Sequence, residues 1–313
     1  MTLIDLKSNK ESCSHPLGKL TSYITNDGSI SLRSSYFRES FHSSHGAKTE
    51  ALEKFIYPAE LNRFLEIKKV NVLDVCLGLG YNSACLLEAI TDTPIHLSWW
   101  GLEIDQRPLK NALKSRSFKE SWSNTVLKIL KSIDISGQWE TTQSDGKIIW
   151  GDARQKLALI PKSTNFDLIL HDAFSPRKCP QLWSEEFLYR LAEKLAPNGR
   201  LITYSTSAAI RGSLKRSGLL LHSIIPINEE RSKWSSGTIG IRPIQEKNSY
   251  THSSYSRALS KMEEEHLLTS AGIPYRDPSG YSNTEEILNW RELEQKNNDL
   301  ESTSSWKKRW EHT

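Results

Sequence analysis

An acidic side chain, an aromatic ring and a proline stand together in the loop after one predicted β-strand. The apolar run of residues 166–170 predicts that strand, and Asp172, Phe174 and Pro176 follow it. Ligands of open α/β sheets bind outside the carboxyl ends of the strands, so chemistry is expected in this loop. The ring can stack on a flat base, the carboxylate can hold an amine nitrogen, and the proline stiffens the turn. The pattern indicates a flat, amine-bearing substrate, and an ordinary turn with Asp172 as a helix cap is the alternative for the loop taken alone.

A second strand, loop and helix have the residue types of a cofactor-binding turn. The β-branched run of residues 70–76 contains Asp74 and leads into Leu-Gly-Leu-Gly-Tyr-Asn, after which residues 83–90 have helical spacing. Gly78 and Gly80 allow a tight turn and a close approach of the backbone to a ligand at the helix N-terminus. The loop does not match an NAD fingerprint, because a serine occupies the third glycine position.

Two further acids follow neighbouring predicted strands. Glu103 ends the strand at residues 96–104 and lies 23 residues after Gly80, where a carboxylate can hydrogen-bond ribose hydroxyls. Asp152 follows a strand at residues 147–150, where it can cap a helix and accept a hydrogen bond from an adenine amino group. Each acid alone is more often a cap or a turn residue. Acids after four successive strands, with a Gly-rich loop after the first, resemble the layout of S-adenosylmethionine-dependent methyltransferases.

Length and composition favour one catalytic domain with additions. The chain has 313 residues, of which 37% are hydrophobic, and four cysteines that form no Cys-x-x-Cys pair. Such cysteines are expected to be reduced in a cytoplasmic protein. No apolar run approaches the roughly 18 residues of a membrane span, and the N-terminus lacks the apolar core of a signal peptide. We therefore expect a soluble, cytoplasmic protein.

Charge is unevenly distributed along the chain. The net charge is +4, but residues 245–313 carry 9 Lys and Arg against 12 Asp and Glu, so residues 1–244 carry +7. Positive charge in the catalytic part suits an anionic substrate such as RNA. A mixed, solvated surface explains this modest charge at least as well. The basic residues expected near the site are Lys48, Arg154, Arg177, Lys178, Arg211, Lys215 and Arg216.

Turn signals and periodicity divide the chain into four parts. A polar, disordered N-terminus is expected over residues 1–19. A β-hairpin, with Asp27-Gly28 as its turn, and a helix are expected over residues 20–68. Residues 69–244 contain the alternating strands and helices of the catalytic domain, and residues 245–313 form a polar C-terminal extension.

Local features refine this division. Residues 115–146 are expected to form a polar insertion, and residues 218–226 and 236–242 an antiparallel hairpin at one edge of the sheet. Two tryptophans flank three basic residues within 305–310, and we expect them to dock on the body of the protein, with base stacking as the alternative. The expected fold class is α/β and Rossmann-like, with a mostly parallel seven-stranded sheet and an antiparallel edge hairpin.

Short motifs between residues 20 and 242 match one enzyme family. The most specific are Asp-Ala-Phe-Ser-Pro at 172–176 and Pro-Gln-Leu-Trp at 180–183. The other matching segments are Asp27-Gly28-Ser29, His45-Gly46-Ala47 with Glu50, residues 78–82, residues 201–204, Arg211 and Ser236-Gly237-Thr238. On these residues the sequence resembles the methyltransferase domain of the bifunctional tRNA 5-methylaminomethyl-2-thiouridine biosynthesis protein. Cys76 departs from the family, where a glycine is usual, and the flavin-dependent oxidoreductase half has no counterpart in the sequence.

The resemblance implies a class I methyltransferase that moves a methyl group from S-adenosylmethionine to the amine of 5-aminomethyl-2-thiouridine at the wobble position. The enzyme mainly has to align nitrogen, methyl carbon and sulfur, and the route of amine deprotonation is left open by the sequence. The expected catalytic residues are Asp172, Phe174 and Pro176. The expected cofactor residues are Asp74, Gly78, Gly80, Asn82, Glu103, Asp152, Asp172 and Glu50. The expected substrate residues are Phe174, Arg177, Tyr204 and Arg211.

Two other functions fit the same fold. An aminopropyltransferase related to spermidine synthase would use decarboxylated S-adenosylmethionine, but such enzymes usually have an extra glycine in the first loop and more acids for a polyamine. A non-catalytic RNA-binding protein on a methyltransferase fold is the second alternative, and intact acids at four strand ends argue against it. The expected partners are tRNA and a separate oxidoreductase that acts upstream, with no metal and no membrane.

Overall fold

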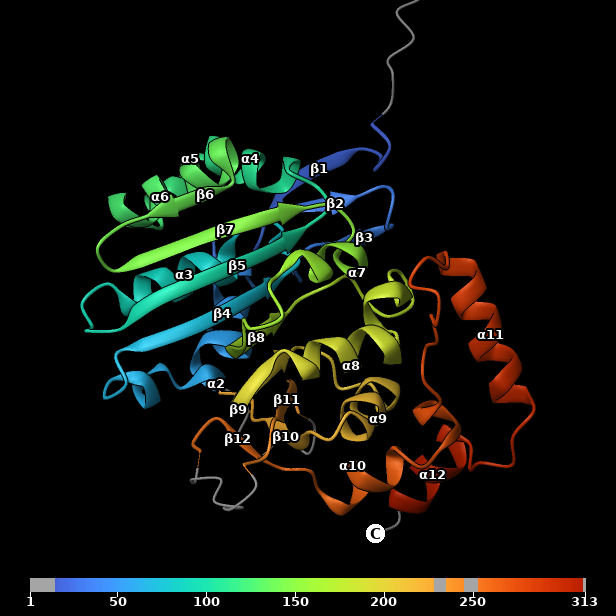
Figure 1. Cartoon of the computed structure of the whole chain (residues 1–313). Coiled ribbons are helices and arrows are strands. Elements are labelled where there is room, and N and C mark those ends of the chain that lie inside the picture. Colours follow the sequence, from blue (N-terminus) through green and yellow to red (C-terminus); the bar gives the residue numbers. More distant parts are fainter. Residues whose placement is uncertain (1–14, 228–234, 245–252, 312–313) are drawn as a thin grey trace, which may run out of the picture.

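A twisted sheet dominates the part of the chain that the structure describes, which is residues 15–227, 235–244 and 253–311 (Figure 1). In this computed structural model its strands are β4 (Lys69–Val75), β5 (His96–Glu103), β6 (Gln138–Glu140), β7 (Ser144–Trp150), β8 (Phe166–His171), β9 (Leu195–Thr203), β10 (Leu220–Ile224), β11 (Gly237–Ile241) and β12 (Ser256–Ala258). Their order across the sheet is β12-β10-β11-β9-β8-β4-β5-β7-β6.

The centre of the sheet has the predicted Rossmann-like arrangement. Strands β7, β5, β4, β8 and β9 are parallel, and β11 and β10 form the predicted antiparallel hairpin beside β9. These are the seven expected strands. The described residues add one antiparallel strand at each edge, because β6 pairs with β7 and β12 pairs with β10. The sheet is therefore wider than the sequence predicted.

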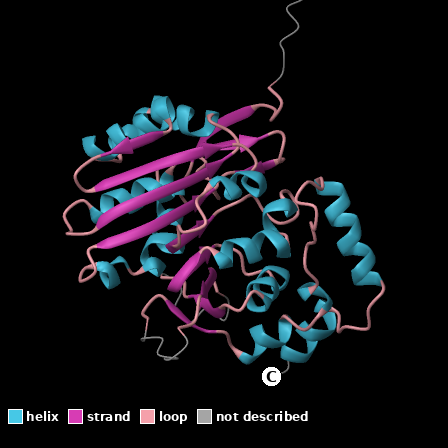
Figure 2. Cartoon of the chain, viewed as in Figure 1, coloured by secondary structure: helices cyan, strands magenta, loops and turns pink. Residues whose placement is uncertain are grey.

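Helices cover both faces of the sheet (Figure 2). One face carries α3 (Tyr81–Ile90), α4 (Arg107–Lys114), α5 (Arg116–Glu120) and α6 (Asn124–Ser136). The other face carries α7 (Ala153–Lys156), α8 (Glu185–Glu193) and α9 (Ala208–Arg216). The βαβ order of these elements places a loop at the carboxyl end of each parallel strand, on one edge of the sheet.

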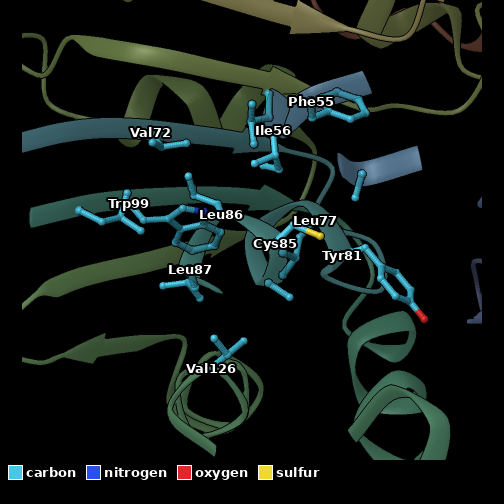
Figure 3. Close-up of a cluster of buried hydrophobic side chains, with 14 of the residues drawn as sticks. Phe55, Ile56, Val72, Leu77, Tyr81, Cys85, Leu86, Leu87, Trp99 and Val126 are labelled. Atoms are coloured by element: carbon cyan, nitrogen blue, oxygen red, sulfur yellow. The ribbon is translucent and has the colours of Figure 1, made fainter. Parts of the chain in front are cut away.

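Side chains alternate along the central strands and build one hydrophobic core on each face. Val70 and Val72 of β4 pack in the core under α3 and α6, whereas Leu73 and Val75 pack in the core under α8 and α9. Figure 3 shows Trp99 of β5 beside the α3 side chains in the first core. Alternation of this kind, with apolar residues on both faces, is expected for a parallel strand that is buried between helices.

The N-terminal extension forms the predicted hairpin and helix. Strands β1 (Leu20–Ile24) and β2 (Ile30–Ser34) are antiparallel, and β3 (Glu39–Ser40) pairs with β2. The Asp27 carboxylate fixes the turn by accepting hydrogen bonds from the Thr25 hydroxyl and the Ser29 amide. The helix continues as α1 (Ala47–Ala51), a π-helical turn η1 (Leu52–Ile56) and α2 (Tyr57–Ala59). The disorder expected for residues 1–19 falls mainly on residues 1–14, which lie outside the described residues.

The prediction that residues 115–146 form a polar insertion is wrong. This segment forms α5, α6 and β6, and it leads directly into β7. The side chains of Val126, Ile129, Leu130 and Ile133 are buried in the core along one face of α6. Their spacing of three and four residues is that of an amphipathic helix, and Ser123 caps its first turn. The polar residues between them occupy the opposite face.

The C-terminal extension folds against the catalytic domain as β12, α10 (Lys261–His266), α11 (Thr284–Lys296) and α12 (Thr303–Glu311) (Figure 1). Trp306 is 1% exposed, and its ring stacks on the His266 ring at 4.3 Å. The indole of Trp310 donates a hydrogen bond to Glu265. Both contacts are with α10 of the same extension, so docking of these tryptophans on the body of the protein stays a prediction, as does the boundary at residue 244.

Two general features of the described residues bear on function. Their helices are too short or too polar to cross a membrane, and they contain no group of three or more His, Cys, Asp or Glu side chains that could hold a metal ion. Cys76, Cys85 and Cys179 are free thiols, as the spacing of the cysteines predicts, and Cys13 lies outside the described residues.

Candidate active site

A cavity of about 520 Å³ lies at the carboxyl ends of the parallel strands, within the size range of small-molecule sites. Its walls come from the strand-end loops, the N-terminal hairpin and helix, and the start of α11. Eight of the residues predicted for the site line it: Glu50, Gly78, Asn82, Glu103, Asp152, Asp172, Phe174 and Tyr204.

Four other predicted residues lie beside this cavity or behind it. Asp74 is fully buried and its carboxylate accepts a hydrogen bond of 2.6 Å from the Ser83 hydroxyl, so it ties β4 to α3; burial raises its pKa to about 7. Gly80 caps α3 with a φ of 89°, a conformation that favours glycine. Pro176 and Arg177 follow the cavity loop, and Arg177 is exposed.

Arg211 is not placed to bind a substrate. Its guanidinium is buried and donates hydrogen bonds to the side chains of Thr238, Glu263, Ser223 and Ser235. These contacts join α9 to the antiparallel edge of the sheet and to α10. The role of Arg211 is structural, because a buried guanidinium with this many acceptors is not free to contact another molecule.

The carboxylate of Asp172 occupies the floor of the cavity at the end of β8. Asp172 is half-buried, and the Asn82 side-chain amide donates a hydrogen bond of 2.8 Å to its Oδ2. Its backbone N–H donates to the carbonyl of Val75, which links the ends of β8 and β4. Burial raises the pKa of Asp172 to about 6, while the Asn82 hydrogen bond opposes this shift. The Asn82 hydrogen bond orients the side chain, and a pKa of about 6 favours its ionised form at neutral pH.

The loop after Asp172 is held by two aromatic side chains. The hydroxyl of Tyr204 donates a hydrogen bond of 2.9 Å to the carbonyl of Ala173, and the indole of Trp183 donates one of 2.6 Å to the carbonyl of Phe174. The rings of Trp183 and Tyr204 meet edge to face at 5.8 Å. Both aromatic side chains therefore position the backbone that carries Asp172 and Phe174.

Glu103 joins the Gly-rich loop to the end of β5. Its Oε2 accepts a hydrogen bond of 2.8 Å from the Gly78 amide, and its Oε1 accepts from the amides of Ile104 and Asp105. Burial raises the pKa of Glu103, whereas these three amides favour the ionised form. Since a carboxylate has about four acceptor positions, one on Oε2 is still available to a hydroxyl group.

Asp152 caps α7, as predicted, by accepting a hydrogen bond from the Arg154 amide. The guanidinium of Arg154 pairs with Asp152 at 2.7 Å and with the buried carboxylate of Asp277 at 2.6 Å. Asp152, Arg154 and Asp277 therefore form one network, which connects the catalytic domain to the C-terminal extension beside the cavity. Thr284 of α11 also lines the cavity.

Residues that the sequence analysis missed close the other side of the cavity. Phe37 stacks on Phe174 at 4.4 Å, and Phe41 meets the same ring edge to face at 4.8 Å. Glu39 accepts a hydrogen bond of 2.8 Å from the Ser175 amide. These contacts attach the N-terminal hairpin to the loop after β8. Short-range sequence patterns do not predict a contact between residues that are 136 positions apart in the chain.

The sequence analysis also missed Lys54. It lines the cavity, and its ammonium lies 3.5 Å from the Glu50 carboxylate, one helical turn earlier. Glu50 also accepts a hydrogen bond from the Ser43 hydroxyl. The spacing of four residues between Glu50 and Lys54 is visible in the sequence and could have indicated the pair.

Comparisons with known proteins find methyltransferases that are similar to this chain. A family model described as S-adenosyl-L-methionine-dependent methyltransferase matches residues 116–235. The structure resembles the crystal structure of MnmC2 from Aquifex aeolicus with a TM-score of 0.74 and 25% identity, over 91% of this chain and 88% of that one. Over these residues the chain resembles S-adenosyl-L-methionine-dependent methyltransferases, and its fold is similar to that of MnmC2.

Two curated relatives match over shorter parts of this chain. The tRNA 5-methylaminomethyl-2-thiouridine biosynthesis bifunctional protein MnmC of Campylobacter hominis is 25% identical over 187 residues, which are 57% of this chain and 27% of the relative. An uncharacterised protein of Methanocaldococcus jannaschii is 28% identical over 214 residues, 66% of this chain and 56% of its own length. This chain thus spans about a quarter to a half of the length of these two relatives.

Proposed function

We propose that this protein transfers a methyl group from S-adenosylmethionine to the amine of 5-aminomethyl-2-thiouridine, or its oxygen analogue, at the wobble position of tRNA. The observation that carries the proposal is the fixed carboxylate of Asp172, which shares one cavity with the ring of Phe174 and with Glu103. A cavity with an amine acceptor beside an aromatic ring suits an aminomethylated base. The role of the bifunctional MnmC relatives in 5-methylaminomethyl-2-thiouridine biosynthesis supports this choice of substrate.

The residues of the cavity fit S-adenosylmethionine. The free acceptor position of Glu103 suits a ribose hydroxyl. Strands β4 and β5 separate Asp152, which follows β7, from Asp172, which follows β8, so Asp152 lies at the end that suits the adenine. Gly78 has a φ of 55° and brings its backbone to the cavity without a side chain, next to the half-buried Cys76. We infer that these residues hold the adenosine part, and that Asp172 and Phe174 face the acceptor base.

S-adenosylmethionine supplies a methyl group on a positively charged sulfur. During transfer the amine nitrogen forms a bond to the methyl carbon while the carbon–sulfur bond breaks and its electron pair returns to sulfur. Asp172 accepts a hydrogen bond from an N–H of the amine and so directs the nitrogen lone pair toward the methyl carbon. Asn82 keeps the Asp172 carboxylate in that orientation. The secondary amine that forms loses its extra proton to solvent or to Asp172.

The proposed reaction needs a primary amine on the base, which a separate upstream oxidoreductase would supply. A tRNA substrate would place the protein in the cytoplasm. The exposed cations Arg177 and Lys178 follow the loop that carries Phe174, and they suit contacts with RNA phosphates. Pro176 holds the turn that separates these cations from the cavity loop.

Transfer of labelled methyl groups to tRNA that carries 5-aminomethyl-2-thiouridine tests the proposal, with nucleosides identified after digestion. Asp172→Asn should lower turnover about 100-fold or more and leave S-adenosylhomocysteine affinity within about twofold, the usual effect of losing an electrostatic contact made in the transition state. Asp167→Asn, on the same strand but bonded to the Asn71 amide, is the matched control and should keep turnover. A parent protein that methylates no tRNA, or an active Asp172→Asn variant, refutes the proposal.

A further inference from the structure

The cavity contains many carboxylates and few cations. Among the described residues that line it, the acids are Glu39, Glu50, Glu103, Asp105, Asp152 and Asp172. The amine and guanidinium groups on the same walls belong to Lys54 and Arg154. Arg154 is already bound by Asp152 and Asp277, at 2.7 and 2.6 Å. Lys54 has one looser contact, with Glu50 at 3.5 Å, so its ammonium has donors left for a ligand.

Lys54 lies at the end of the cavity where Asp172 lies. The segments α1 and η1, which carry Glu50 and Lys54, pack against α3, and Asn82 of α3 donates the hydrogen bond to Asp172. If Glu103 holds the ribose, the reactive sulfur of a bound cofactor must lie between the two carboxylates. The amino-acid end of the cofactor then extends toward Glu50 and Lys54.

The helix that carries both side chains is fixed against the core. Ala51 and Phe55 are each 2% exposed, and the π-helical turn η1 begins directly after α1. Single π-helical turns inside helices occur frequently at functional sites. Because Ala51 and Phe55 also contribute to the cavity wall, this turn presents Glu50 and Lys54 at a constant position.

The charges of Lys54 and Glu50 are complementary to those of an amino-acid group. The methionine end of S-adenosylmethionine carries an α-carboxylate and an α-ammonium, and the decarboxylated form keeps only the amine. We propose that Lys54 binds the α-carboxylate and Glu50 the α-ammonium, so that Lys54 selects S-adenosylmethionine over its decarboxylated form. This inference depends on the cofactor that the site binds and does not depend on the identity of the nucleic-acid substrate. Lys54 thus determines that the site transfers methyl rather than aminopropyl groups.

Calorimetric titration of the full chain with the two cofactor forms tests the proposal. The parent should bind S-adenosylmethionine about 10- to 100-fold more tightly than the decarboxylated form, the usual gain from one charge-assisted hydrogen bond. Lys54→Met should remove this preference by weakening only the carboxylate-bearing form. Glu50→Gln should weaken both forms by a similar factor, since both keep the amine. Lys54→Arg should retain most of the preference.

Lys110→Met is the matched control, because it removes the same charge from the exposed surface of α4. It should leave both affinities unchanged. Equal binding of the two forms by the parent overturns the proposal without any variant. A Lys54→Met protein that folds and loses affinity equally for both forms also overturns it. A parent that prefers S-adenosylmethionine but methylates no tRNA would refute the proposed substrate and leave the assignment of Lys54 intact.

Discussion

The ring of Phe37 stacks on the ring of Phe174, with centroids 4.4 Å apart and planes 24° from parallel. One face of Phe174 is therefore covered by the N-terminal hairpin, and the rings of Phe174 and Phe41 form a T-shaped contact. A base can reach the covered face only when the two rings separate. Inserted between them, the base would gain a stacking contact on each of its faces.

Replacing Phe37 with Ala should weaken tRNA binding modestly. The variant loses one base stack of about 1–3 kcal/mol, but it no longer has to separate a ring pair that contributes about 0.5–1.5 kcal/mol. The difference predicts a KM for tRNA that rises by a factor of about 2 to 15, with kcat and S-adenosylhomocysteine affinity nearly unchanged. Steady-state kinetics on modified tRNA measures this effect. A lower KM in Phe37→Ala would show that Phe37 only obstructs the site.

The pKa of Asp172 predicts a change in the pH dependence of catalysis. Burial raises this pKa to about 6, so lowering the pH through 6 protonates the carboxylate and removes the acceptor for the substrate amine. The slope of log kcat/KM against pH should therefore increase by about one unit below pH 6. The substrate ammonium has a pKa of about 10, so its deprotonation adds a slope of about one unit to log kcat/KM at every pH well below 10.

Asp172→Asn is the control for this pH profile. The residual activity of the variant should lack the change in slope near pH 6 and retain the dependence that comes from the substrate amine. A change of slope that persists in the variant would assign the titration to another group. Asp74 is the alternative, because burial raises its pKa to about 7.

Binding of tRNA should depend on salt through the exposed cations Arg177 and Lys178. Raising monovalent salt from 50 to 200 mM should weaken binding by about tenfold or more if two or more phosphates are contacted. Single substitutions Arg177→Ala and Lys178→Ala should each lower the slope of log K against log salt by about 0.7–0.9. Filter binding across a salt series measures these slopes.

Lys215→Ala is a matched control for charge removal. Lys215 is paired with Glu264 of the C-terminal extension, so its loss should leave the salt slope unchanged. If Lys215→Ala lowers the slope of log K against log salt as much as Arg177→Ala does, the slope reports the net charge of the protein and not a contact between Arg177 and phosphate. No salt dependence in the parent would favour a small amine as the substrate.

Much of the central fold was predictable because the parallel strands are short apolar runs that end in turn residues. The strands predicted at residues 218–226 and 236–242 contain β10 and β11, and the acids at the strand ends lie in one cavity except Asp74. The error at residues 115–146 came from weighting polar composition above spacing. Val126, Ile129, Leu130 and Ile133 already had the spacing of a helix face.

Residues whose role depends on a distant partner were harder to predict. Arg211 has the residue type of an RNA contact, but its main ionic partner, Glu263, is 52 residues away in the extension. Similarly, the excess positive charge of residues 1–244 is partly neutralised by carboxylates of the extension that pair with Arg154 and Lys215. Phe37 and Lys54 reach the cavity from the N-terminal extension, and their contribution depends on how that extension packs.

The pairing of the catalytic domain with its extension has a consequence for synthesis on the ribosome. Arg154 and Asp277 are 123 residues apart, and β12 begins at Ser256. A nascent chain that ends before Ser256 has every parallel strand but leaves β10 with an unpaired edge. Arg154 and Arg211 then lack their carboxylate partners from the extension. Open strand edges promote aggregation, so the interval between synthesis of β10 and of β12 is when this chain most needs a chaperone.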